Sequence, residues 1–169
     1  MKALIRIKKN KLNIGYQQLA KIIWQVPQDK FFVSHIGGDE TLQKEYWLKI
    51  WPDFTDLFVD WCKVPFIWGA TPVCIAPGKE AKNTLVVYSD HLNELTVTKM
   101  AFYNLVKYLA KELDGVIQER DSDMWITAEA FMAKHRDIMQ LSLDEAIGKS
   151  IKEAQTLQAI AEDDELFLL

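Results

Sequence analysis

The sequence has few residues that could cross-link the chain or anchor it in a membrane. It contains two cysteines in 169 residues, Cys62 and Cys74, and they do not form a CxxC pair. No apolar run approaches the roughly 18 residues that a membrane helix needs. The amino-terminal stretch MKALIRIKKN has too short an apolar run for a signal peptide and lacks a small-residue cleavage site. We therefore expect a cytoplasmic protein with reduced thiols.

Motifs for nucleotides and metals are also missing. Gly37-Gly38 is not followed by GxxG or GK[ST], so the sequence has neither a dinucleotide fingerprint nor a phosphate loop. Asp121 and Asp123 have the spacing that opens a calcium loop, but the glycine and the distant glutamate of that motif do not follow. We expect no cofactor and no metal site.

Apolar residues are plentiful, and the charges are unevenly distributed. The hydrophobic share is 49%, with six tryptophans, which favours one globular domain over residues 1–169. Residues 1–111 carry 15 Lys/Arg and 10 Asp/Glu, or +5, whereas residues 112–169 carry 5 and 14, or −9, which together give the net charge of −4. An acidic final third attracts basic partners and repels nucleic acid, although it is also typical of well-solvated helices.

The apolar spacing predicts strands and helices in alternation. Strands are expected at residues 3–8, at 31–36 as a buried strand, within 66–76 and at 84–88. Helices are expected from Ile14 to Val26, from Asp39 or Thr41 to Ile50, after Pro52, and from Thr96 to a left-handed cap at Gly115. A hairpin of residues 116–117 and 125–126 precedes a helix capped by Thr127 and a last helix from Ser142 to about Ala161. We predict an α+β fold with a single mixed or mainly antiparallel sheet packed against helices.

No catalytic constellation emerges from local motifs. His135 lies on an apolar helical stripe, which is typical of a hydrogen-bonded core or rim residue. His35 precedes Gly37-Gly38 and is a better candidate for contacting a ligand. A hydrolase-like enzyme centred on His35 with Asp90 or His91 therefore stays open as an alternative.

One segment, KELDGVIQERDSDMWITAEAF at residues 111–131, concentrates carboxylates beside a tryptophan. It runs from a helix through Asp-Gly, a short strand and an acidic turn to an aromatic-x-Thr cap and a second helix. This order resembles a segment found in small immunity proteins of bacterial polymorphic toxin and contact-dependent inhibition systems. The resemblance is confined to this part of the chain.

The resemblance implies a protein that is not an enzyme and that binds and occludes a cognate toxin domain. A basic toxin would fit the acidic final third, with no role for nucleic acid or a membrane. The expected contact residues are Asp114, Glu119, Asp121, Asp123, Trp125 and Glu129, with Asp163, Asp164 and Glu165 of the acidic tail as a second choice. A small adaptor or structural protein acting through the apolar end of the chain is a further alternative, and the oligomeric state stays open.

Overall fold

The computed structural model describes residues 1–26, 33–52, 72–79, 82–89 and 94–156. Along these residues the elements are β1 (Lys2–Arg6), α1 (Tyr16–Trp24), β2 (Val33–Ile36), α2 (Asp39–Glu45), β3 (Leu48–Pro52), β4 (Val73–Pro77), β5 (Thr84–Ser89), α3 (Thr96–Glu112), β6 (Val116–Glu119), α4 (Ala128–Lys134), α5 (Arg136–Met139) and α6 (Leu143–Ala154). The strands form one sheet in the order β2-β3-β4-β5-β1-β6, and all neighbouring pairs are antiparallel. The predicted α+β fold is confirmed.

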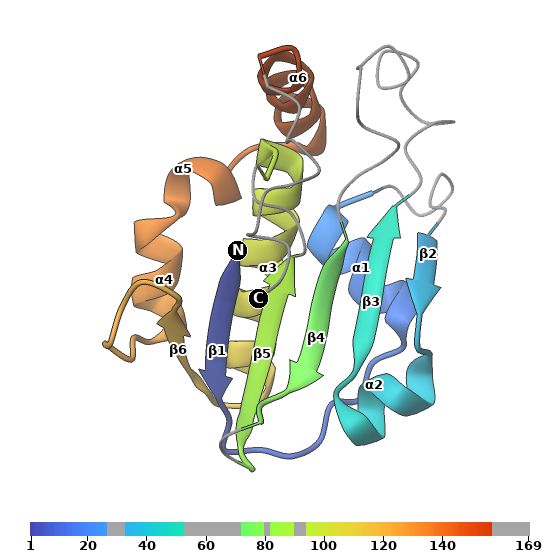
Figure 1. Cartoon of the computed structure of the whole chain (residues 1–169), viewed down its shortest axis with the longest axis vertical. Helices are drawn as coiled ribbons and strands as arrows, with labels where there is room; N and C mark the ends of the chain where they lie inside the picture. The colour runs from blue at the N-terminus through green and yellow to red at the C-terminus, as the bar shows by residue number, and fades with distance from the viewer. Residues whose placement is uncertain (27–32, 53–71, 80–81, 90–93, 157–169) are drawn as a thin grey trace, which may run out of the picture.

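Helices α1 and α3 cover one face of this sheet (Figure 1). The strands are amphipathic because alternate side chains point to opposite faces, and the side chains facing the helices are buried. These are Ala3 and Ile5 of β1, Leu48 and Ile50 of β3, Val73 and Ile75 of β4, Leu85 and Val87 of β5, and Ile117 of β6. Helix α3 lies against most of the sheet and is itself buried along Met100, Leu105 and Leu109. The core therefore lies between α3, α1 and the sheet.

The amino end of α3 is completed by side chains of α6. The backbone N–H of Thr96 donates to Glu153 Oε2 at 2.8 Å, and that of Val97 donates to Ser150 Oγ at 2.8 Å. These bonds satisfy donors that have no partner within α3 itself. Glu153, one of the acids of the final third, therefore has a structural role. No helix in the described part of the chain combines the length and the apolarity needed to cross a bilayer.

Three sequence predictions need correction. The helix predicted to continue to Ile50 ends at Glu45, because Tyr46 adopts a left-handed conformation with φ of 53°. Residues 48–52 then form β3, where buried Leu48 and Ile50 alternate with half-buried neighbours in the period of a strand. The prediction failed because Leu42, Tyr46 and Ile50 recur at helical spacing.

The strand predicted at 31–36 as buried is an edge strand, and its described part is mostly exposed. Within the described residues, β2 pairs with β3 alone, and Ser34, His35 and Ile36 are exposed. Apolar and β-branched composition predicts a strand but does not tell whether the strand lies inside a sheet or at its edge.

The left-handed residue after α3 is Asp114, with φ of 49°, and not Gly115. Gly115 is needed for a different reason, because a Cβ at this position would lie 2.9 Å from the carbonyl oxygen of Arg6. The helix expected after Pro52 and the end of the helix expected to reach Ala161 lie outside the described residues.

Candidate functional site

The acidic segment singled out from the sequence forms the turn between β6 and α4, at the edge of the sheet (Figure 1). Ile117 and Ile126 exchange two backbone hydrogen bonds of 2.8 Å across the turn, as the predicted hairpin requires. The N–H of Ser122 donates to the carbonyl of Glu119 at 3.1 Å, and that of Met124 donates to Ser122 Oγ at 3.1 Å. The turn therefore has a defined backbone conformation.

The turn tip, which we define as residues 121–124, presents three of its four side chains to solvent, and Ser122 is half-buried. Asp121 and Asp123 are exposed and form no ion pair within the described residues. Met124 directly follows Asp123; it is 69% exposed and is the most exposed large apolar side chain of the described residues. Glu129 is also exposed, in the first turn of α4, where the helix dipole favours a negative charge.

The base of the turn is a polar cluster around Glu119. Its Oε2 accepts from Lys134 Nζ at 2.5 Å and its Oε1 accepts from His135 Nε2 at 2.7 Å. The His135 ring is stacked 4.0 Å from Tyr103 and lies 4.6 Å from the buried ring of Phe131. Because a carboxylate only accepts, this contact assigns the proton to Nε2 of His135. The interpretation of His135 as a hydrogen-bonded rim residue is confirmed.

This cluster shifts two pKa values. Partial burial by itself raises the pKa of Glu119, but the hydrogen bonds and charges of Lys134 and His135 outweigh it, so the pKa lies below 4.5. The pKa of Tyr103 is raised by burial and, to a smaller extent, by the charges of Glu119 and Asp137. Glu119 is therefore an ionised carboxylate already satisfied by its own chain.

Two other predicted contact residues also have partners within the chain. Asp114 lies 3.7 Å from Lys8 Nζ, in a pair whose side chains are more than half exposed and which contributes little to stability. The guanidinium carbon of Arg6 lies 4.0 Å above the ring of Trp125, in a cation–π contact. Of the predicted set, only Asp121, Asp123 and Glu129 face solvent without such a contact in the described residues. Asp163, Asp164 and Glu165 lie outside them.

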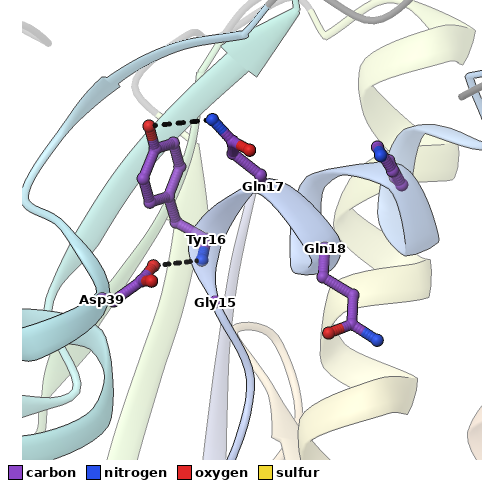
Figure 2. A pocket seen from close by; sticks show the side chains of 6 residues that line it. Gly15, Tyr16, Gln17, Gln18 and Asp39 are labelled. Atoms are coloured by element: carbon purple, nitrogen blue, oxygen red, sulfur yellow. Dashed lines mark hydrogen bonds between the residues drawn. The ribbon is translucent and has the colours of Figure 1, made fainter. Parts of the chain in front are cut away.

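A separate pocket lies where α1 begins, close to α2 (Figure 2). It has a volume of about 560 Å³ and is lined by Gly15, Tyr16, Gln17, Gln18, Lys21 and Asp39. Asp39 Oδ1 accepts from the N–H of Tyr16 at 2.8 Å, so a carboxylate of α2 already occupies the positive end of α1. Gly15 makes room for it, because a Cβ there would lie 3.1 Å from Asp39 Oδ2.

His35 lies beside this pocket, with its ring centroid 3.9 Å from that of Tyr16 and the two rings tilted by 36°. Because a carbonyl oxygen only accepts, Nδ1 of His35 donates to the carbonyl oxygen of Gly37 at 2.5 Å. Asp90 and His91, its predicted companions, lie outside the described residues. Within the described part of the chain, no three His, Cys, Asp or Glu side chains gather closely enough to hold a metal ion.

Sequence reasoning missed the partners of Glu119. Lys134 and His135 come from the helix after the turn, and their positions relative to β6 depend on how α4 packs against the strand. The sequence did contain a signal for this contact. Lys134 and His135 are neighbouring residues with nitrogen donors, and they follow an acidic strand that needs such partners.

Comparison with known proteins identifies no relative. No protein-family model, no curated protein and no solved structure matches this chain. The resemblance of residues 111–131 to immunity proteins stays a prediction.

Proposed function

We propose that this chain is an immunity protein, which binds a basic toxin domain through the turn tip and blocks it without catalysing a reaction. The observation that carries the proposal is the exposed Met124, which directly follows Asp123 on a turn of defined conformation. An exposed apolar side chain beside charged groups is the kind of residue that anchors an interface.

Met124 and the two aspartates of the turn tip would act differently. Methionine is flexible and polarisable, so Met124 suits an apolar pocket of the partner. Asp121 and Asp123 would steer a positively charged partner toward the turn and raise the rate of association. Since the turn is already ordered by its hydrogen bonds, little conformational entropy would be lost on binding.

Glu119 and Trp125 belong to the support of this surface under the proposal. Glu119 is held by Lys134 and His135, and Trp125 by Arg6. To contact a toxin, Glu119 would have to give up hydrogen bonds that it already forms in the free protein. The proposed contact surface is therefore smaller than the acidic segment as a whole.

The test is copurification with a toxin domain encoded beside the gene for this chain, followed by binding kinetics. The double reversal Asp121→Lys with Asp123→Lys is expected to weaken binding at least about tenfold, mainly through slower association, and to flatten its dependence on salt. Met124→Ala should instead accelerate dissociation, because an apolar anchor is lost.

The matched control is Glu45→Lys with Glu112→Lys, which changes the net charge equally at two exposed acids away from the turn. It should slow association much less than the turn-tip reversal. Equal effects of the two double variants would mean that overall charge, and not the position of the turn, governs association. Unchanged binding after the turn-tip reversal and after Met124→Ala would eliminate this surface.

A further inference from the structure

Six exposed lysines gather at one end of the sheet, where β1 and β4 finish and β5 begins (lower end of the sheet in Figure 1). They come from three segments that are far apart in the sequence. We call this group the basic end: Lys8, Lys9 and Lys11 after β1, Lys79 and Lys82 between β4 and β5, and Lys111 in the last turn of α3.

Backbone hydrogen bonds hold these segments together. The N–H groups of Lys8 and Lys9 both donate to the carbonyl of Leu113 at 3.0 Å, which joins the segment after β1 to the end of α3. The N–H of Ile7 donates to the carbonyl of Asn83 at 2.8 Å, which joins the same segment to the connection before β5. The grouping of positive charge is therefore fixed by the fold.

Ion pairs within the described residues neutralise little of this positive charge. Lys8 pairs with Asp114, whereas the other five lysines form no ion pair within the described residues. The negative end of the α3 dipole gives a structural reason for Lys111, Lys8 and Lys9. It gives none for Lys79 and Lys82, which lie between β4 and β5. Glu112 and Asp114 are exposed acids at the end of α3, and Glu80 lies outside the described residues.

The side chains between these lysines indicate the kind of polyanion. Asn10, Asn13 and Asn83 are exposed amides, which donate hydrogen bonds to phosphate and sugar oxygens. Leu12, the one large apolar residue among the lysines after β1, is buried and cannot insert into a lipid interface. Membrane-surface segments instead place tryptophan, phenylalanine or leucine between their basic residues.

We propose that the basic end is a docking surface for the phosphate backbone of nucleic acid, independent of base sequence. The proposal does not depend on the immunity function, since it uses the other charge of the molecule. The acidic final third argued against nucleic acid, but the fold brings Lys79, Lys82 and Lys111 together with the lysines after β1. Contacts to about three phosphates predict an affinity that falls about 40-fold between about 50 and about 200 mM salt.

The experiment is fluorescence anisotropy of the full chain with a labelled DNA duplex of about 20 base pairs, in two unrelated sequences, at the two salt concentrations. The expected result is equal binding to both sequences and the steep loss with salt. The test variant is Lys9→Gln with Lys79→Gln and Lys82→Gln, which should weaken binding about tenfold or more at the lower salt concentration.

The matched control is Lys44→Gln with Lys149→Gln and Lys152→Gln, three exposed lysines elsewhere with the same change in net charge. This control should bind DNA within about twofold of the unaltered chain if the contact is local. Three results overturn the proposal: no binding at the lower salt concentration, an equal loss in both triple variants, or binding to phosphatidylserine vesicles without binding to DNA.

Discussion

The two edge strands of the sheet, β2 and β6, differ in how they are supported. Outside β6, the turn and α4 add a backbone bridge, a satisfied carboxylate and stacked rings. Outside β2, the described residues add no further strand, and Ile36 is 51% exposed. An edge strand has no neighbouring strand on one side. If it presents side chains to a partner, other contacts must therefore hold it in place. The difference supports the contact proposed for the β6 edge.

The largest expected effect comes from the apolar support of the β6 edge. Phe131→Ala removes a fully buried ring that contacts both Tyr103 and His135, and it should lower the free energy of unfolding by about 3–5 kcal/mol. Ile36→Ala at the β2 edge should change it by about 0.5 kcal/mol or less, because that side chain is largely exposed. Urea denaturation measures both, and comparable losses would contradict the difference between the edges.

The next effect concerns the close approach of backbones beside β6. Gly115→Ala places a Cβ 2.9 Å from the carbonyl oxygen of Arg6, so the strands must shift, and we expect a loss of about 2 kcal/mol. Gly148→Ala is the control, because nothing lies within 4 Å of its Cβ position in α6. That change should stabilise the protein by up to about 1 kcal/mol through helix propensity. Thermal unfolding of both variants gives the comparison.

A smaller effect should depend on pH. Because the pKa of Glu119 in the folded chain lies below its unfolded value, its contribution is present above about pH 4.5 and is lost as the pH falls through the folded pKa. Glu119→Gln should lower the free energy of unfolding by about 1 kcal/mol near neutral pH, and by less in acid. Urea midpoints at pH 7 and near pH 3 test this, and a deficit that is independent of pH would rule out the ionised pair.

The smallest effect is at the side of the turn. Arg6→Gln removes the cation above Trp125 and should lower the free energy of unfolding by about 0.5 kcal/mol. A double-mutant cycle with Trp125→Leu isolates the contact, since the effect of Arg6→Gln should disappear when the aromatic ring is absent. Additive changes would mean that Arg6 and Trp125 do not interact in solution.

Local chemistry made parts of the fold predictable. The capping box of Ser142 and Glu145 and the Thr127 cap were predicted from neighbouring residues, and both are present. The hairpin that carries the turn was also predicted from the sequence. By contrast, β3 was predicted as helix, because Tyr46 and Ile50 fit helical spacing. The left-handed conformation of Tyr46 ends the helix before Ile50 is reached. Elements fixed by residues a few positions apart were the predictable ones.

The sequence by itself determined the caps that open α4 and α6 and the uneven charge, since each can be read without knowing how the chain packs. The tertiary structure alone decided which charges keep partners. It brought Lys134 and His135 to Glu119, left Asp121 and Asp123 in solvent, and joined Lys9 to Lys79 and Lys82 at one end of the sheet. The physical reason is that Coulomb and hydrogen-bond energies depend on separation in space, which packing sets and sequence distance does not.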